Sequence, residues 1–360
     1  MTELTVRARF VVVGGGPRAS FFLRQASRLR DRFDVVGVHS RSAETRARVE
    51  ARWGLPTFDS VEALIALKPE FAFVGVARVA AMDPTIAFAE AGIPVMVETP
   101  PAPEAPALRE LWGRVGHEGL VQVAEQSLFM PSHLAKLAAV EDGIIGTPTS
   151  IHVSSNHLYH AVAIMRRFLK SGSGATTVRA SDFMAPLVDP IINDVWQHDQ
   201  SEKLKGTTLA TVDFGSSMGF YDFTQHQWFN PLRARRLLIR GSQGEFNNSE
   251  IVRLADGAII ESRVLRRQTG IDLNHEGFDL DHISIDGRVL FRNPFKGLRM
   301  SDEDIAAGLL LVTMAAWVRD EGVAPYPLAD GSQDHLIGLA IEEAASTGQT
   351  VSTVREAWGQ

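Results

Sequence analysis

The sequence predicts an α/β protein in which a parallel, doubly wound sheet is followed by an α+β domain with a mainly antiparallel sheet. Three observations support this prediction. The chain has 360 residues, more than one hydrophobic core usually holds, so two domains are expected. Apolar strand-like runs alternate with helical segments as far as residue 124, and short links of that kind favour a parallel sheet. From residue 207 the chain changes to successive strands joined by turns.

The first domain is predicted over 1–122. Its opening strand is a β-branched run that ends at glycines, as buried parallel strands often do. Gly54 and Gly92 end two of its helices, and Ser60 is suited to cap a third. The expected strands are 9–13, 34–39, 71–76, 93–97 and 119–124. The expected helices are 18–31, 43–53, a short one from 60, 85–91 and 105–116.

The second domain is predicted over 123–360. Asp256-Gly257 and Asp286-Gly287 are turn sequences typical of β-hairpins. The expected helices are 131–141, 158–169, 301–319 and 334–347. The expected strands are 148–153, 208–214, 217–223, 234–240, 251–254 and 258–263.

Composition excludes several classes of function. The formal net charge is -7, whereas nucleic-acid-binding proteins usually carry a basic face. The chain has no cysteine, which excludes disulfides and thiolate chemistry and suits a cytoplasmic location. Residues 1–5 lack the basic and apolar regions of a signal peptide. The longest apolar stretch, 308–318, is about half of what a membrane span needs.

A glycine turn follows the first strand and opens the first helix, with the pattern Gly14-x-Gly16-x-x-Ala19. Gly14 permits the tight turn, Gly16 lets backbone approach a pyrophosphate, and Ala19 allows close packing of helix on strand. Pro17 suits the first helical turn, and the helix N-terminus that includes Arg18 attracts phosphate. The turn predicts a Rossmann-type dinucleotide site; a glycine-rich turn without a ligand is the alternative.

The end of the second strand indicates which dinucleotide binds. NAD-binding domains usually place an acid there to hold the ribose 2′-hydroxyl. This chain has His39-Ser40-Arg41-Ser42 instead, and Ser40 and Arg41 suit a 2′-phosphate. The sequence therefore favours NADP, with NAD as the alternative if Arg41 is only a solvated loop residue.

Several features in order resemble the glucose–fructose oxidoreductase/inositol dehydrogenase (Gfo/Idh/MocA) family. They are the glycine turn, Ala89-x-Ala91-Gly92-Ile93-Pro94-Val95, Glu98-Thr99-Pro100, His160 with Arg166, Gly241-x-x-Gly244-Glu245 and Ser346-Thr347-Gly348-Gln349-Thr350-Val351. The resemblance implies an N-terminal Rossmann domain, a C-terminal open-faced sheet and a nicotinamide cofactor near Glu98, Thr99 and Pro100. It also implies a sugar, polyol or related hydroxy compound as substrate, and dimers or tetramers formed through the sheet.

Two departures make the chain an atypical member. Thr99 stands where the family has the lysine of Glu-Lys-Pro, and Asn156 stands where it has an acid four residues before the histidine. A threonine hydroxyl does not ionise at neutral pH, so Thr99 cannot replace the lysine as a base.

Histidines near one helix start are the candidates to replace this proton chemistry. Oxidation of an alcohol needs a base for the hydroxyl proton, and histidine has the most suitable unperturbed pKa. His157 and His160 are three residues apart and can face one side of a helix. We expect His160 to be the acid/base, with His157 and Tyr159 binding substrate or sharing that role. The alternative is that His157 caps the helix and Tyr159 packs in the core.

Two further interpretations stay open. His152, together with His157 and His160, is a weak candidate for a zinc site, but no carboxylate nearby in sequence completes it. The segments 196–199 and 221–228 are rich in amides, carboxylates and indoles that suit sugars, or they are a polar loop and a sheet face.

Three functions are compatible with these residues. The first is an NAD(P)-dependent oxidoreductase acting on a CH–OH group of a sugar-like compound. The second is a redox-neutral enzyme that retains its nicotinamide and cleaves a glycosidic bond. The third is a non-catalytic sensor that binds a dinucleotide.

Overall fold

The computed structural model describes residues 7–192, 195–270 and 277–359, so the expectation for residues 1–5 lies outside the described residues. The chain divides into two compact units, each treated by itself below. The division into domains at residue 122 stays a prediction. Unit 1 draws on Met1–Pro131, Gln268–Leu280 and Asn293–Ser332. Unit 2 draws on Ser132–Arg267, Asp281–Arg292 and Gln333–Gln360.

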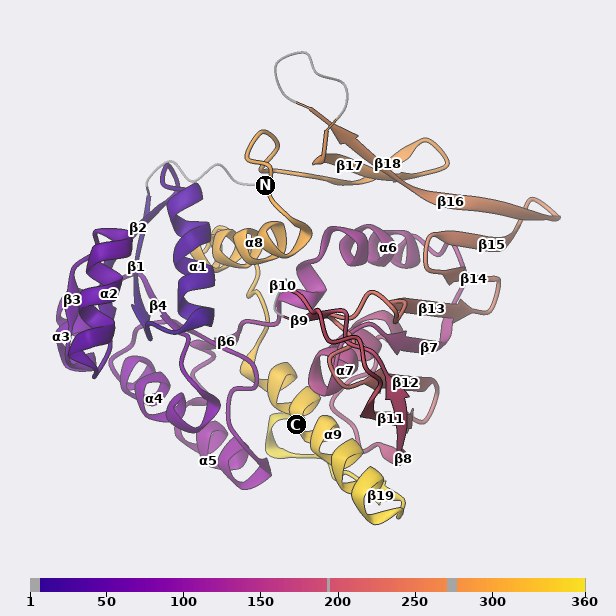
Figure 1. The fold of residues 1–360 in the computed structure, drawn as a ribbon, viewed down its shortest axis with the longest axis horizontal. Coiled ribbons are helices and arrows are strands. Elements are labelled where there is room, and N and C mark those ends of the chain that lie inside the picture. Colours follow the sequence, from indigo (N-terminus) through magenta and orange to yellow (C-terminus); the bar gives the residue numbers. More distant parts are fainter. Residues whose placement is uncertain (1–6, 193–194, 271–276, 360) are drawn as a thin grey trace. The chain divides into compact units, whose positions relative to one another are not determined.

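Unit 1 is built on a parallel sheet with the strand order β3-β2-β1-β4-β5-β6 (Figure 1). The order reverses between β1 and β4, as in doubly wound dinucleotide-binding folds, and the predicted parallel sheet is confirmed. Its strands are β1 Ala8–Val13, β2 Phe33–His39, β3 Thr57–Phe58, β4 Phe71–Val74, β5 Val95–Val97 and β6 Val121–Val123. Its helices are α1 Pro17–Arg28, α2 Ala43–Trp53, α3 Val61–Ala66, η1 Arg78–Ala80, α4 Met82–Glu90, α5 Ala105–Val115, η2 Gln126–Phe129 and α8 Asp302–Trp317.

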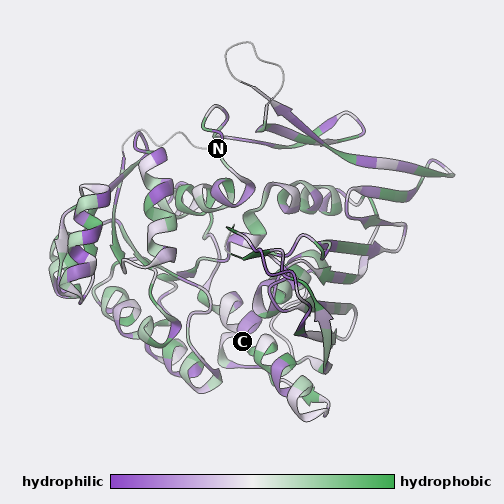
Figure 2. Ribbon diagram, in the orientation of Figure 1, coloured by the Kyte–Doolittle hydropathy of each residue, from purple (hydrophilic) through white to green (hydrophobic). Residues whose placement is uncertain are grey.

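Aromatic side chains fill the core of unit 1. Phe10 of β1 stacks on Phe71 of β4 with ring centroids 4.8 Å apart, and Phe22 of α1 lies 4.1 Å from Phe73. All four rings are fully buried, and β1 and β4, which carry three of them, are mainly green in the hydropathy view of Figure 2. This burial of apolar surface is what holds α1 against the sheet.

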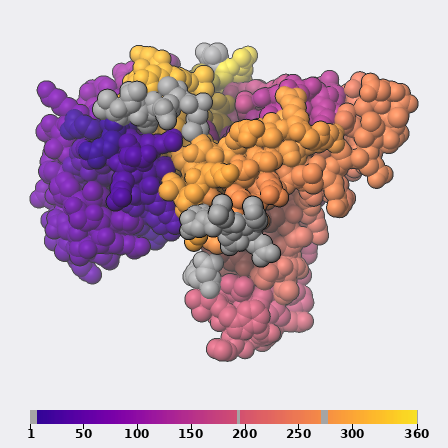
Figure 3. Space-filling view, turned by 90° about the horizontal axis from the view of Figure 1, so that it is seen from above, coloured from indigo at the N-terminus to yellow at the C-terminus, as the bar shows by residue number. Residues whose placement is uncertain are grey.

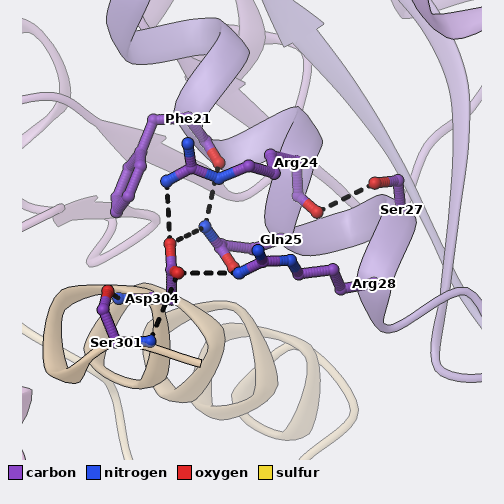
Figure 4. A network of polar contacts seen from close by, with 7 residues as sticks. All are labelled: Phe21, Arg24, Gln25, Ser27, Arg28, Ser301 and Asp304. Atoms are coloured by element: carbon purple, nitrogen blue, oxygen red, sulfur yellow. Dashed lines mark hydrogen bonds and ion pairs between the residues drawn. The ribbon is translucent and has the colours of Figure 1, made fainter. Parts of the chain in front are cut away.

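A polar network joins α8 to α1 within unit 1 (Figure 4). The carboxylate of Asp304 accepts hydrogen bonds from Arg24, Gln25 and Arg28 of α1, at 2.8, 2.6 and 2.7 Å. Ser301 caps α8 in a capping box, accepting from the Asp304 backbone N–H at 3.1 Å. Residues almost 280 positions apart in sequence are therefore held together.

Unit 2 is built on a large sheet with the order β18-β17-β16-β15-β14-β13-β7-β12-β11-β8-β19. Neighbouring strands are antiparallel wherever their pairing is described, except that β7 and β12 run parallel, which confirms the predicted sheet. Its strands are β7 Pro148–Ser154, β8 Thr177–Leu187, β11 Lys203–Asp213, β12 Met218–Thr224, β13 Arg236–Gly241, β14 Gly244–Asn247, β15 Glu250–Ala255, β16 Ala258–Thr269, β17 Asp279–Ile285, β18 Arg288–Arg292 and β19 Val351–Ser352. Its other elements are α6 Pro131–Glu141, α7 Leu158–Leu169, α9 Leu328–Thr347, η3 Ala357–Gly359 and the hairpin of β9 Ile191–Ile192 with β10 Val195–Trp196.

The sequence prediction missed β8. Phe183 and Met184 are neighbours in this strand and are both exposed, so β8 lacks the strict alternation by which a half-buried strand is detected. The strands β8 and β11, rose in Figure 3, lie in the lobe at the lower edge of that view. The structure also ends α1 three residues earlier than predicted and starts α9 six residues earlier. The glycine at position 331 weakened the helical pattern at the start of α9. A glycine is required there because a Cβ would lie 2.6 Å from the side chain of Val123.

Other local predictions are confirmed. The bounds of α2, α6 and α7 agree with the sequence, and Gly54 ends α2 with φ of 65°. The Asp256-Gly257 and Asp286-Gly287 turns have positive φ at both positions, as type I′ hairpin turns require. None of the described helices is both long enough and apolar enough to cross a membrane.

Candidate functional site

The glycine turn of unit 1 leaves room for a phosphate. Gly14 has φ of +119°, and a Cβ there would lie 2.6 Å from the carbonyl oxygen of Gly75. Around Gly16, by contrast, no atom lies within 4 Å of where a Cβ would be. Gly16 is the N-cap of α1 without a side-chain cap, and Pro17 follows it. Backbone N–H groups at a helix start with open space beside them suit a pyrophosphate, so the turn fits a dinucleotide.

The loop after β2 carries positive charge. His39 is buried, its Nδ1 lies 3.2 Å from the carbonyl oxygen of Phe58, and burial lowers the pKa of its ring. Arg41 is exposed. Arg46, which the sequence analysis did not select, donates hydrogen bonds to the carbonyl oxygens of Ser40 and Arg41 at 2.8 and 3.1 Å. Arg46 therefore shapes the loop and adds a second cation beside Arg41.

Glu98 is the centre of a buried contact at the end of β5. The guanidinium of Arg18 donates to both of its carboxylate oxygens at 3.0 Å, and Arg18 also donates to the side chain of Gln126. The backbone N–H and hydroxyl of Thr99 donate to Glu98 Oε1 at 3.2 and 3.1 Å. The Arg18 guanidinium is thus directed at Glu98, and the Thr99 proton is held by the same carboxylate.

The three predicted catalytic residues lie together at the start of α7 in unit 2. The ring of His157 lies 5.0 Å from that of His160 and 5.3 Å from that of Tyr159, and Tyr159 lies 4.4 Å from His160, measured between centroids. His157 occupies the N-cap position, but its side chain makes no capping hydrogen bond. The position therefore matches the capping interpretation while the side chain belongs to the ring cluster.

Three further residues border this cluster and were not predicted to act in it. The ring of Trp228 lies 5.1 Å from His157, and that of His335 lies 5.6 Å from Tyr159. The hydroxyl of Tyr221 accepts a hydrogen bond of 3.1 Å from the backbone N–H of Leu158, and burial raises the pKa of this phenol. Trp228 had a signal in the sequence, because the segment 221–228 was selected as sugar-compatible. The residues next to His335 in the sequence gave no indication that it lies beside α7.

His152 belongs to a different place from His157 and His160. Its Nε2 lies 2.7 Å from Oδ1 of Asp222. Burial would raise the pKa of Asp222, but hydrogen bonds from His152 and Ser154 outweigh it and lower this pKa. Within the described part of the chain, no three histidine or acidic side chains are grouped as metal ligands. The zinc interpretation of the three histidines therefore has no support in the geometry.

The His152–Asp222 pair lines a hollow of about 670 Å³ on one face of the large sheet. Leu209, Phe220 and Arg240 line it as well. The residues that alternate with His152 and Arg240 along their strands, such as Val153 and Ile239, are fully buried. This open face of the sheet is available to another molecule.

Arg166, which the resemblance singled out with His160, has a structural partner. Its guanidinium donates to Asp334 of α9 at 2.6 Å, and both side chains are almost fully buried. Asn156 accepts a hydrogen bond of 2.7 Å from the Ser155 hydroxyl. Arg166 thus joins the last turn of α7 to α9.

Known proteins share a family model and a fold with this chain. Residues 8–125 match the family model described as "Oxidoreductase family, NAD-binding Rossmann fold" (GFO_IDH_MocA). No curated protein matches the chain.

Solved structures share the fold along the whole chain. A levoglucosan dehydrogenase solved with NADH and levoglucosan has a TM-score of 0.68 at 16% identity, covering 96% of this chain and 99% of that one. A myo-inositol dehydrogenase from Corynebacterium glutamicum has a TM-score of 0.65 at 17% identity, with the same coverage. The WlbA dehydrogenase from Bordetella pertussis, solved with NADH and UDP-GlcNAcA, has 0.65 at 14%, covering 99% and 100%. The match to the Gfo/Idh/MocA oxidoreductase model thus covers residues 8–125, and the likeness to the solved structures shows the fold of the remainder.

Proposed function

We propose that the chain is an NAD(P)-dependent oxidoreductase that transfers a hydride between nicotinamide and a sugar, polyol or related hydroxy or keto compound. The observation that carries the proposal is the open space at Gly16, where the uncapped start of α1 can bind a pyrophosphate. The similar structures support the substrate class, since they include dehydrogenases for levoglucosan and myo-inositol.

The residues proposed to hold the cofactor fall into three groups. The backbone of Gly14, Gly16, Pro17, Arg18 and Ala19 would bind the pyrophosphate. Ser40 and Arg41 would bind the ribose end. Glu98, Thr99 and Pro100 would border the nicotinamide, and the Arg18 side chain would act by holding Glu98. When bound, the nicotinamide supplies the hydride acceptor or donor.

NADP is proposed as the preferred cofactor. Arg41 is exposed, and Arg46 fixes the backbone that carries it. The described loop offers no carboxylate at the position where an NAD-binding domain holds the 2′-hydroxyl. Two guanidinium groups at this loop favour a phosphate there over a hydroxyl.

His160 is proposed to take the substrate's hydroxyl proton as the hydride leaves carbon, and to return it in the reverse direction. His157 and Tyr159 would orient the substrate or share the proton, since their rings lie within 5.3 Å of each other and of His160. Thr99 is not a base here, because a threonine hydroxyl does not ionise at neutral pH; its hydrogen bond to Glu98 fixes its orientation.

A second copy of the chain is the proposed protein partner. The open face of the large sheet exposes apolar side chains that an assembled dimer or tetramer would bury. A homodimer or homotetramer through this face is therefore proposed.

Replacement of His160 tests the function. A panel of sugars and polyols is assayed for cofactor reduction with NAD and with NADP. We expect His160→Asn to lower kcat by about 10²- to 10⁴-fold, as loss of a general acid/base does, while cofactor affinity is kept. The control is His117→Asn, which changes an exposed histidine outside the cluster.

The other outcomes identify the alternatives. The redox-neutral enzyme is indicated if the purified protein holds a nicotinamide that does not exchange and if the protein cleaves glycosides. Cofactor binding with no turnover on any panel member, unaffected by His160→Asn, is the sensor.

A further inference from the structure

The loop between β12 and β13 is fixed by two buried amides. Gln227 accepts a hydrogen bond from the backbone N–H of Thr224 at 2.9 Å and donates to the carbonyl oxygen of Ser154 at 2.8 Å. Asn230 donates to Val188 and Asp189 at 2.8 and 2.9 Å. Both amides are 3% exposed. Buried side-chain hydrogen bonds of this kind give a loop one conformation.

Between these anchors lies Trp228, which is 37% exposed. Phe223 stacks on its indole with centroids 5.2 Å apart and an angle of 22°, so one face of the indole is supported. His157 borders it at 5.1 Å, and the ring of His157 is itself 5.0 Å from His160. A rigid aromatic surface therefore reaches solvent one ring away from the proposed acid/base.

We propose that Trp228 is the residue on which the substrate stacks, and that it selects a hydroxylated six-membered ring, a pyranose or a cyclitol, over an acyclic polyol. This rests on the proposed function, because it concerns the substrate of the same site. A ring with equatorial hydroxyls presents C–H groups on its faces, which the negative face of an indole attracts. An acyclic polyol presents no such face, and ordering it costs more rotational entropy.

The position also explains why an apolar side chain is exposed here. A preformed indole loses little conformational entropy when it binds a ligand, as in other sites that place aromatic residues against flat ligands. The ring edge carries hydroxyls, and the imidazoles of His157 and His160 offer hydrogen-bonding groups for them. Stacking would hold the ring and leave its hydroxyl for proton transfer.

Equilibrium binding tests this without requiring turnover. The full chain, saturated with NADP+, is titrated calorimetrically with hexopyranoses, methyl pyranosides and cyclitols, and with acyclic polyols of matched hydroxyl number. We expect at least one ring compound to bind more tightly than its acyclic match. Trp228→Leu should weaken ring binding about threefold to tenfold, with Trp228→Phe retaining most of the affinity.

Controls separate stacking from damage to the fold. Leu232→Ala changes an exposed apolar residue of the same loop and should leave ring affinity unchanged, and thermal unfolding should agree among the variants. The proposal is overturned if no ring compound binds, if acyclic polyols bind equally well, or if the Leu and Phe variants lose the same affinity. Ring compounds could bind in a way that depends on Trp228 while the nicotinamide absorbance does not change. That result would contradict the proposed oxidoreductase function and support the stacking role of Trp228.

Discussion

Arg18, in the first turn of α1, and Arg41, in the loop after β2, lie where the phosphates of a dinucleotide are expected, but their contacts differ. The Arg18 guanidinium donates hydrogen bonds to both carboxylate oxygens of Glu98. Arg41 is exposed and its backbone is held by Arg46. Of these two arginines, Arg41 is therefore the one proposed to recognise a 2′-phosphate, with Arg46 beside it.

Replacement of Arg41 tests cofactor choice. We expect Arg41→Ala to weaken NADP binding by about tenfold or more, because a charge-assisted hydrogen bond to phosphate is lost, and to leave NAD binding nearly unchanged. Fluorescence titration of both cofactors measures this. Arg48→Ala, another exposed arginine nearby on α2, is the control. Equal losses for NADP and NAD would contradict selection by Arg41.

Among individual residues, the sequence predicted those that a local backbone conformation requires. Gly14 and Gly16 form a recognisable pattern because the turn itself demands them. Partners far apart in sequence had no such signal: Arg18 and Glu98 are 80 positions apart, and His335 reaches Tyr159 from another helix. The assigned roles of the individual site residues stay predictions.

Among the elements, α8 depends on one carboxylate for its contact with α1. Burial alone would raise the pKa of Asp304, but hydrogen bonds from Arg24 and Arg28 outweigh it and hold this pKa below its ordinary value of 3.8. Because the folded-state pKa is the lower one, the stabilisation is fully present above the ordinary pKa. It is lost as pH falls through the folded-state value.

Replacement of Asp304 tests this contact. At pH 7 we expect Asp304→Asn to lower the free energy of unfolding by roughly 1–3 kcal/mol, since Arg24, Gln25 and Arg28 lose a charged, buried acceptor. The difference from wild type should shrink in acid, below pH 3.8. Urea unfolding at both pH values measures it. Glu303→Gln, exposed in the same first turn, is the control, and an equal loss there would assign the effect to the helix dipole.

Strong end signals let the sequence place the end of one helix and the start of another correctly. Gly54 after α2 and the Ser60 cap of α3 are examples, and Ser60 accepts from Ala63 at 3.2 Å as expected. β8 was missed because its side chains are exposed on both faces over part of its length. Periodicity detects burial on one face and cannot detect a strand without it.

For the whole molecule, the open face of the large sheet is the feature that bears on assembly. Leu209 is 42% and Phe220 is 38% exposed on it, and contiguous apolar surface of this kind usually marks an interface.

The return of Asn293–Ser332 to unit 1 was not predictable, because contacts over such separations leave no periodic pattern in the sequence.

Charge on this face tests the assembly. We expect the wild type to be a dimer or tetramer, and Phe220→Asp to shift it to monomer, because burying a carboxylate unpaired is costly. Size-exclusion chromatography with light scattering measures the mass. Val79→Asp, at an exposed valine of η1, is the control. A monomeric wild type, or assembly unaffected by Phe220→Asp, would contradict the proposed interface.

The packing of α8 on α1 has a consequence for synthesis of the chain. A Cβ at Gly308 would lie 2.9 Å from Phe295 and 3.3 Å from Leu29, so the approach is close. The ribosome adds about 5–20 residues per second, and it finishes the cofactor-binding sheet long before it makes Asp304. A nascent chain of 301 residues would contain every residue of the glycine turn, but its first helix would still lack the partner that braces it.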